Sequence, residues 1–203
     1  MSKPSWLIIS PASGSGNSTI SNSAAAHTGR VARTGTVTVS AVGVSDVTYD
    51  VTQSPLAEFA AFDNGASMAA SKSGGTVTVT GTSNSSKLTF SWGDGTSDVS
   101  IPSTYTANGS SADNGTAISG DPGAVSQFAF SIALTFPANE TISDITRQLV
   151  VTPNSGSGDA AAITITQAAG DPTLSVSPAS ITIPQAGTAQ SVSVTSNTSW
   201  TVS

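Results

Sequence analysis

Alternation of apolar and polar residues is the strongest pattern in this chain, and it predicts β-strands. Residues 36–41 and 47–52 alternate apolar side chains with Thr, Ser or Asp on either side of a break at Gly43. A period of two places every second side chain on the same face, as a half-buried strand requires. We therefore expect an antiparallel hairpin that runs from Arg33 to Gln53.

Short strands of the same kind are expected along the whole chain, separated by Gly, Asn, Pro and Ser. Their expected ranges are 6–9, 18–23, 59–62, 68–70, 76–80, 87–92, 127–136, 174–176, 181–183, 191–195 and 199–203. Residues 93–124 are instead rich in turn-forming residues and predict a long insertion. Many short strands at close spacing favour an all-β sandwich.

The hairpin pattern returns later in the chain, which indicates an internal repeat. Residues 147–167 again begin with Arg and end with Gln, at the same separation as in residues 33–53. Residues 75–92 and 187–200 share a second series of motifs in the same order: Gly-Thr, an alternating strand, an Asn turn and a Trp. Trp6 is assigned to the same place in the repeat as Trp92 and Trp200.

These matches divide the chain into three parts. We expect one complete immunoglobulin-like domain at residues 55–169, with the long insertion at about 93–124. Residues 1–54 should be the C-terminal half of a further sandwich. Residues 170–203 should be the N-terminal half of such a sandwich.

Composition narrows the classes of function. Only six Lys and Arg residues are present in a chain of net charge −6, and no segment concentrates them. Clustered basic residues are needed to neutralise phosphates, so nucleic acid is not an expected partner. The chain has no cysteine, which excludes disulfides and thiolate metal sites. No apolar run is long enough for a signal peptide or for membrane insertion, so we expect synthesis in a host cytoplasm without a signal peptide.

Candidate catalytic residues are few. His27, the only histidine, stands in an Ala-, Thr- and Gly-rich stretch without a nucleophile-elbow pattern, so we expect a surface loop. Glu58, Glu140 and Asp144 do not suggest the pair of carboxylates that glycosidases place across a cleft. We expect no enzymatic activity and no cofactor.

The remaining candidates are ligand contacts. Asp94, Asp98, Asp113 and Asp121 could bind Ca²⁺ through oxygen, but their irregular spacing favours turn formation. The Trp side chains could stack on sugars, although a strand start favours core packing. Tyr105, inside the insertion, is the candidate for an exposed loop contact.

The repeat resembles the BACON family of immunoglobulin-like β-sandwiches, named for Bacteroidetes-associated, carbohydrate-binding, often N-terminal domains. The matching motifs are residues 174–178, 187–188, 199–200, 10–17, 33–36 and 51–53. Residues 174–203 followed by residues 7–53 read as one nearly standard repeat. The resemblance implies a sandwich fold and either carbohydrate binding or a spacer role. It also implies a link to virion proteins of tailed phages that infect gut Bacteroidetes.

Two half-sandwiches would each expose strand edges and an apolar face, which proteins normally cover. We expect the two halves to complete each other between subunits, head to tail, in a ring or filament. Closure within one chain is the alternative. The expected assembly interface consists of Trp6, Leu7, Ile8, Ile9, Leu174, Val176, Ile181, Ile183, Val192, Val194, Trp200 and Val202.

The sequence thus favours a non-enzymatic structural protein of a bacteriophage virion, as a capsid-decorating or tail/fibre component. Its partners would be further copies of itself, other virion proteins and, as a further candidate, host-surface or mucin glycans. The main alternative is a carbohydrate-binding module of a bacterial surface protein. A plain spacer is a third possibility.

Overall fold

The structure of the chain is a computed structural model, described here for residues 2–93, 98–156 and 159–203. These residues form fifteen β-strands and no α-helix, which confirms the expected all-β class. The first strands are β1 (Leu7–Ser10), β2 (Ser21–Ala24), β3 (Arg33–Val39), β4 (Val47–Gln53), β5 (Ala60–Phe62), β6 (Ser67–Ala70), β7 (Gly75–Ser83) and β8 (Leu88–Trp92). The others are β9 (Thr104–Ala107), β10 (Ser110–Asp113), β11 (Phe128–Phe136), β12 (Ile145–Pro153), β13 (Ala161–Gln167), β14 (Leu174–Ser177) and β15 (Ser193–Ser196).

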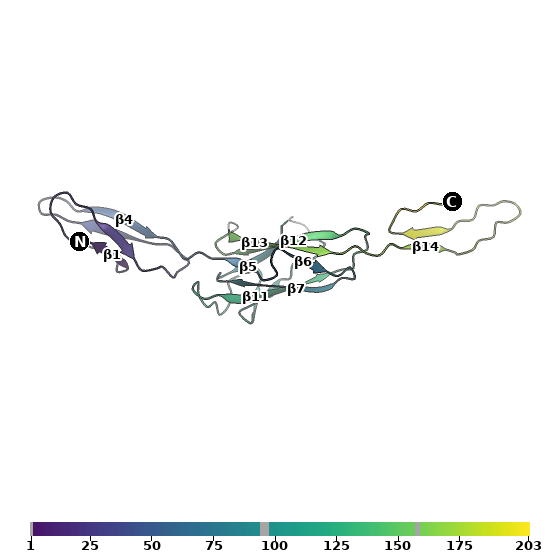
Figure 1. The fold of residues 1–203 in the computed structure, drawn as a ribbon, viewed down its shortest axis with the longest axis horizontal. Helices are drawn as coiled ribbons and strands as arrows, with labels where there is room; N and C mark the ends of the chain where they lie inside the picture. The colour runs from purple at the N-terminus through teal and green to yellow at the C-terminus, as the bar shows by residue number, and fades with distance from the viewer. Residues whose placement is uncertain (1, 94–97, 157–158) are drawn as a thin grey trace.

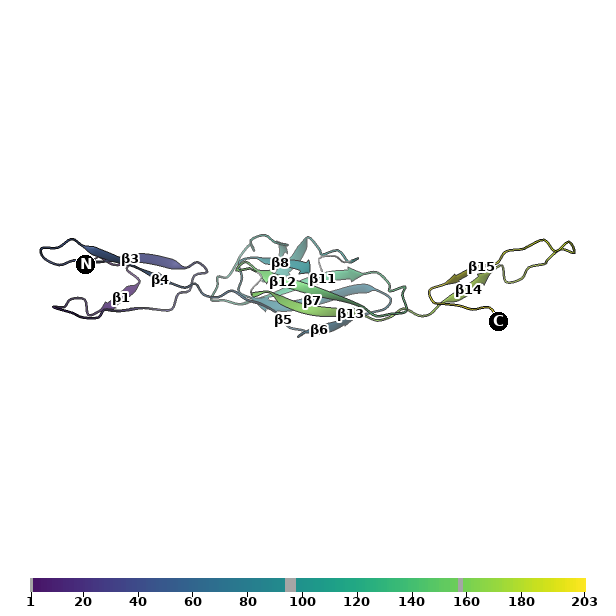
Figure 2. The ribbon, with the colours of Figure 1, turned by 90° about the horizontal axis from the view of Figure 1, so that it is seen from above.

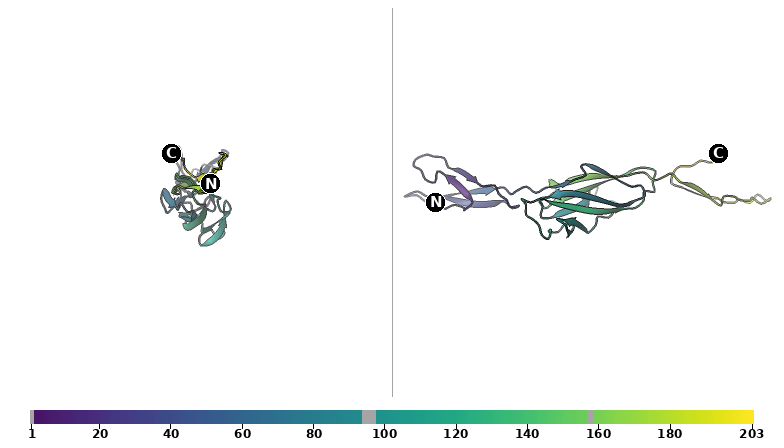
Figure 3. Two further views of the ribbon diagram at one scale, coloured as in Figure 1. Left: turned by 90° about the vertical axis from the view of Figure 1, so that its right-hand side faces the viewer. Right: turned by 60° about the horizontal axis from the view of Figure 1, so that its bottom comes forward.

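The strands are arranged in three parts along one axis (Figure 1). A central domain, residues 55–169, lies between an N-terminal segment, residues 2–54, and a C-terminal segment, residues 170–203. The two segments lie at opposite ends of the molecule in each long view (Figures 2 and 3). They therefore do not contact each other within one chain.

The central domain is a sandwich of two sheets. One sheet has the order β10-β9-β11-β7-β5, and the other has the order β6-β13-β12-β8. The first two strands of the domain belong to different sheets: β5 pairs antiparallel with β7 in the first sheet, and β6 pairs parallel with β13 in the second. Side chains along β11 alternate strictly between buried and less buried positions. This alternation turns one face of each sheet toward a shared core.

Aromatic rings and aliphatic side chains fill this core. Phe90 makes edge-to-face contacts with Phe130 and Tyr105, at centroid distances of 5.6 and 5.0 Å. The prediction that Tyr105 is an exposed loop contact is wrong, because its side chain is only 4 % exposed. Tyr105 lies on β9, in a hairpin that extends the five-stranded sheet, so the expected insertion is partly regular structure. Burial raises the pKa of the Tyr105 phenol.

The terminal segments are built from two-stranded sheets. The N-terminal segment contains the pairs β1-β2 and β3-β4, and the C-terminal segment contains only β14-β15. Leu7 and Val37 are the buried apolar side chains of the N-terminal segment. No described side chain of residues 171–203 is buried. Neither segment has a core of its own comparable with that of the central domain.

Two expected strands of the C-terminal segment do not form. Residues 181–183 and 199–203 have the right sequence pattern, but they have no β-structure in the single chain. A strand needs a neighbour to satisfy its backbone N–H and C=O groups, and these residues have none among the described parts of the chain. The predictions were therefore wrong for the isolated chain.

Candidate functional site: the open faces of the terminal segments

Exposed apolar side chains are concentrated in the C-terminal segment. Val202, Leu174, Ile183, Val176 and Trp200 are 50 % exposed or more. Ile181 and Val192 are exposed to a lesser degree, and Val194 is half-buried. These are the side chains expected at the assembly interface, and they are uncovered in one copy of the chain. Exposed apolar surface of this kind makes the segment a candidate interaction site.

The interface residues expected at the other end are less uniform. Leu7 is already buried within the N-terminal segment, whereas Ile8 is 60 % exposed. Ile9 is half-buried. Trp6 is half-buried because the guanidinium of Arg33 lies over its ring, 4.6 Å from the ring centroid. Only part of the expected N-terminal surface is thus free for a partner.

A cleft of about 620 Å³ opens between the two layers of the N-terminal segment. One wall is the loop between β1 and β2 together with Ile20, which begins the approach to β2. The other wall is the last residue of β3 and the two residues that follow it, residues 39–41. In a complete sandwich, side chains from further strands fill the space between the layers. In the single chain this space between the layers is open.

The central domain shows how its first strands are tied together. The side-chain amide of Asn84 donates to the carbonyls of Ala57 and Ala124, both at 3.0 Å, and its oxygen accepts the Phe59 N–H at 2.8 Å. The preceding Ser83 hydroxyl donates to the Phe59 carbonyl at 2.6 Å. This Ser-Asn pair fixes the end of β7 against the chain that enters β5.

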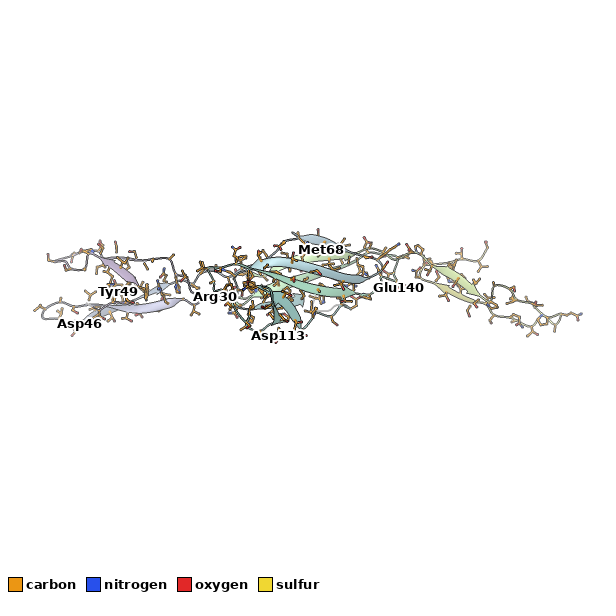
Figure 4. The ribbon with its side chains drawn as sticks, turned by 90° about the horizontal axis from the view of Figure 1, so that it is seen from below. Arg30, Asp46, Tyr49, Met68, Asp113 and Glu140 are labelled. Atoms are coloured by element: carbon orange, nitrogen blue, oxygen red, sulfur yellow. The ribbon has the colours of Figure 1, made fainter. Side chains whose placement is uncertain are left out.

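The C-terminal segment contains the same arrangement. The side-chain amide of Asn197 donates to the carbonyls of Asp171, at 2.9 Å, and Glu140, at 3.1 Å. Its oxygen accepts the Thr173 N–H at 2.8 Å, and the Ser196 hydroxyl donates to the Thr173 carbonyl, also at 2.8 Å. The bond to Glu140 also attaches the C-terminal segment to the central domain (Figure 4).

Strand register and turns extend this correspondence. Ala60 lies opposite Ser83 between β5 and β7, and Leu174 lies opposite Ser196 between β14 and β15. A turn before β7 is closed by the N–H of Gly74 and the carbonyl three residues earlier. Gly187 closes an equivalent turn in the same way. Both glycines have positive φ, at 74° and 72°, a conformation that glycine adopts without strain. The C-terminal segment therefore repeats the β5–β7 region.

A second arrangement holds the far end of the central domain. Arg147 donates to the side-chain oxygen of Gln167 at 3.2 Å and stacks over Phe136, with 5.3 Å to the ring centroid. The Gln167 amide nitrogen donates to the carbonyls of Pro137, at 2.7 Å, and Ser71, at 3.1 Å. Gln167 is fully buried. Its amide thus joins the end of β11 to the segment that follows β6.

The N-terminal segment repeats most of this second arrangement. Arg33 donates to the Gln53 side-chain oxygen at 3.0 and 2.8 Å and stacks over Trp6. The Gln53 amide nitrogen donates to the carbonyl of Ala25 at 2.8 Å, as Gln167 does to Pro137. Among the described residues, however, the Gln53 amide nitrogen has no second acceptor.

His27 has a role in this same repeat. Its Nε2 lies 2.8 Å from the carbonyl four residues later, and its Nδ1 accepts the N–H two residues later at 3.4 Å. The side chain of Asn139 makes the equivalent two contacts in the central domain, at 2.8 and 3.0 Å. His27 is thus a loop-forming residue, in the place that the sequence analysis expected for it.

The three tryptophans do not share one structural position, contrary to the sequence alignment. Trp92 ends β8, which pairs with β12, and its indole N–H donates to the Val99 carbonyl at 2.6 Å. Trp6 precedes β1, which pairs with β2. Trp200 follows Asn197 by only three residues, whereas Trp92 follows Asn84 by eight. The short Gly-Thr and Asn motifs were aligned correctly, but the spacing to Trp was misleading.

An arginine clamp fixes the N-terminal segment to the central domain (Figure 4). Arg30 forms a double ion pair with Asp121 and donates to the Asn84 carbonyl, with Nη2 at 2.5 Å. The buried carboxylate of Glu58 lies 3.2 Å from Arg30 Nε. The hydrogen bond and charge of Arg30 lower the pKa of Asp121, and Asp121 raises the pKa of Arg30.

The acidic residues considered for calcium are placed in different ways. Asp121 is held by Arg30, and Asp98 pairs with Arg147 at 2.8 Å. Asp113 ends β10, and Asp94 lies outside the described residues. In the part of the chain that the structure describes, no three His, Asp or Glu side chains gather as a metal site would need. Nor does that part contain a helix long and apolar enough to cross a lipid bilayer.

Comparison with protein families gives a match over the N-terminal segment. The profile of the BACON family, "Putative binding domain, N-terminal", matches residues 1–54. This range coincides with the N-terminal segment and supports the resemblance for that segment. No curated protein matches the chain.

Proposed function

We propose that this chain is a non-enzymatic structural protein whose copies join head to tail. The C-terminal segment of one copy would complete the N-terminal segment of the next, so that a second sandwich forms at each junction. The assembled protein would be a component of a bacteriophage virion, on the capsid surface or in a tail fibre.

One observation supports this proposal above all others. The C-terminal segment repeats the hydrogen bonds of β5 and β7, and the N-terminal segment repeats those of β11, β12 and β13. In the central domain these two sets of strands belong to one sandwich. Each terminal segment therefore contains the part that the other lacks.

The geometry of the molecule favours joining between copies. The two segments lie at opposite ends of the chain (Figure 1), and residues 55–169 between them form a packed sandwich. Closure within one chain would require both segments to swing back along the central domain, and the bonds of Arg30 to Asp121 and of Asn197 to Glu140 hold them at its two ends. Contacts between different surfaces of identical copies build rings when the rotation closes and filaments when it does not.

Burial of exposed apolar side chains would provide the driving force for joining the copies. The C-terminal segment exposes Leu174, Ile183 and Val192, among other apolar side chains. Removing apolar surface from water contributes about 25 cal/mol per Å². Stable protein interfaces bury roughly 1,200–2,000 Å² in total. Completing a sandwich from two half-sandwiches is expected to reach that range.

The virion setting rests on sequence features. The resemblance to BACON repeats implies a link to phage virion proteins, and the lack of cysteine and of any basic cluster is compatible with such a component. Imaging of virions from a phage that encodes this chain, with an antibody against the central domain, would test the setting. Labelling of intact particles supports it, and particles that never carry the label contradict it.

Sedimentation and electron microscopy of the full chain test the joining of copies. We expect rings or filaments in the wild type, and their loss in Val192→Asp, because a charge would enter the completed core. Val125→Asp is the matched control, since Val125 is 68 % exposed on the central domain. The proposal fails if Val192→Asp assembles as well as this control.

Carbohydrate binding is the alternative that the family match favours. Trp200 is 50 % exposed and could stack on a sugar ring. Tyr105 is buried and is unsuitable for that role. A glycan array with the wild type and Trp200→Ala separates the two functions. Glycan binding by a monomer, lost in Trp200→Ala, would favour the alternative.

A further inference from the structure

We infer that two strand edges of the N-terminal segment, β2 and β4, receive two defined strands of a second copy in the register of the central domain. Residues 188–196 of that copy would pair with β2, and residues 181–183 would pair with β4. This inference rests on the proposed function, because it specifies how the joined copies fit together.

The first edge is that of β2. In the central domain β11 pairs with β7, with Phe136 opposite Gly75 and Ile132 opposite Val79. Equivalent hydrogen bonds show that Ala25 of the N-terminal segment corresponds to Pro137 of the central domain, and that Ser196 of the C-terminal segment corresponds to Ser83. Transferring the register then places Ile20 opposite Val192 and Ser21 opposite Ser191 of the second copy.

The exposure of these side chains agrees with that register. Ile132 and Val79 are no more than 1 % exposed in the central domain. Ile20 and Val192, their counterparts, are 36 % and 39 % exposed in the single chain. Since β1-β2 is a two-stranded sheet, β2 has one unpaired edge on which the second copy can add a strand.

The second edge is that of β4. In the central domain β6 pairs parallel with β13, with Met68 opposite Ile165 and Ala70 opposite Gln167. The equivalent turns at Gly74 and Gly187 place residues 181–183 in the position of residues 68–70. Ile181 would then lie opposite Val51, and Ile183 opposite Gln53. This explains why residues 181–183 have a strand pattern but no strand in one copy.

Gln53 supplies an independent observation. The Gln167 amide nitrogen donates to two carbonyls, of which Ser71 belongs to the turn that follows β6. The Gln53 amide nitrogen donates to one described acceptor, Ala25. The residue of the C-terminal segment that corresponds to Ser71 is Pro184, which closes the turn with Gly187. The Pro184 carbonyl of the second copy is therefore the missing acceptor of Gln53.

The charges along these strands permit the pairing. Between residues 172 and 203 the sequence contains no charged side chain, and β2 contains none. The two surfaces therefore meet without like-charge repulsion. Because the receiving edges match strands that the same sequence encodes, the occupant is a second copy and not an unrelated protein.

The edge of β3 differs from the other two. Transfer of the β8–β12 register would place Val202 of the second copy opposite Thr38. In the single chain that place is taken by Ser2, whose carbonyl accepts the Thr38 N–H at 2.9 Å. Residues 201–203 can thus pair with β3 only after Ser2 leaves. The inference concerns the β2 and β4 edges, where no such competitor lies among the described residues.

Disulfide trapping in the full chain tests the register. The protein has no cysteine, so single variants Ser21→Cys and Ser191→Cys can be mixed and oxidised. Their counterparts Ala133 and Thr78 are directly opposite and exposed. Ser23→Cys with Ser191→Cys is the matched control, because two residues along a strand displace the partner by about 6.6 Å. Disulfides need Cα atoms within about 7 Å.

We expect a dimer from Ser21→Cys with Ser191→Cys, and at least about tenfold less from the control mixture. Thr52→Cys with Thr182→Cys should also yield a dimer and tests the β4 edge separately. If the copies assemble in sedimentation but only the control mixture gives a disulfide-linked dimer, the register is wrong and the proposed function stands. Failure of the wild type to assemble would overturn the proposed function itself. Trapping of Ser21→Cys with itself would show a head-to-head contact and contradict the inference.

Discussion

The central domain and the N-terminal segment each contain an Arg–Gln contact, and the two glutamines differ in burial and in the number of hydrogen bonds that they donate. Gln167 is fully buried and its amide nitrogen has two acceptors. Gln53 is half-exposed and has one described acceptor. The local partners, Arg147 and Arg33, are present in both cases. The Arg–Gln contact forms within one hairpin, as Arg33 and Gln53 show. The second hydrogen bond of the glutamine amide forms only where another strand lies beside the hairpin, as at Gln167.

The same division holds for whole strands. Turns and caps form in both regions, because their partners are close in sequence or in the same hairpin. Sheet formation in the C-terminal segment stops at β14 and β15, since the strands that would flank them are not beside them. Backbone groups in an unpaired strand gain no ladder hydrogen bonds to offset the loss of chain entropy.

The largest effect is expected from truncating the equivalent isoleucines. Ile132→Ala should lower the unfolding free energy of the central domain by about 2–5 kcal/mol, because it opens a cavity at a buried site. Ile20→Ala should change the stability of the dilute chain by less than about 1 kcal/mol but weaken assembly. Urea unfolding and sedimentation measure these effects. Equal losses in dilute chains would show that the N-terminal segment is already complete.

Replacing Gln167 should lower the stability of the monomer more than replacing Gln53 does, whereas replacing Gln53 should weaken assembly. Gln167→Ala removes one hydrogen bond from Arg147 and one from each of the Ser71 and Pro137 carbonyls at a fully buried site, and should cost about 1–3 kcal/mol in the unfolding free energy. Gln53→Ala should have a smaller effect on the monomer and should increase the dissociation constant of assembly. Thermal unfolding of dilute samples, followed by a concentration series, separates the two. A larger loss of monomer stability in Gln53→Ala would contradict the comparison.

The asparagines test the two hairpin anchors. Asn84→Ala should destabilise the central domain by about 1–3 kcal/mol, because three backbone groups lose the hydrogen bonds of the buried Asn84 side chain. Asn197→Ala should leave the central domain unchanged and release the C-terminal segment from Glu140. Hydrogen exchange at Thr173, whose N–H bonds to Asn197, reports that release. Unchanged protection in Asn197→Ala would show that another contact holds the hairpin.

The smallest effect is expected at the Arg30 clamp, as a dependence on pH. Arg30 lowers the pKa of Asp121, so the contribution to stability is complete above the unfolded value of about 3.9. It is lost as the pH falls through the lowered value in the folded state. Asp121→Asn should therefore be less stable than the wild type near neutral pH, by roughly 0.5–1 kcal/mol, and the difference should shrink in acid. Urea titrations at both pH values detect this change, and a constant difference would argue against the clamp.

The sequence was sufficient for the features that depend on local patterns. Alternation identified the all-β class, and the repeated Arg-to-Gln stretches identified the hairpins β3-β4 and β12-β13. Those stretches pair in registers that differ by two residues, yet the Arg-Gln contact is retained in both. The repeat was therefore a better guide to side-chain contacts than to exact strand pairing.

Features that depend on distant partners were missed. Tyr105 stands among turn residues in the sequence, and only the pairing of β9 with β11 places it against Phe90. The spacing of Trp200 from Asn197 gave no sign of which strand it would flank. The role of Gln53 could have been found only by comparing its bonds with those of Gln167, because the two sequences alone are equivalent.

Light scattering of the wild-type chain over a wide concentration range tests the central claim most directly. The account predicts a mass that rises well above 20.0 kDa with concentration, toward a ring or a growing filament. A mass that stays at that of one chain at every concentration would contradict the joining of copies through their terminal segments.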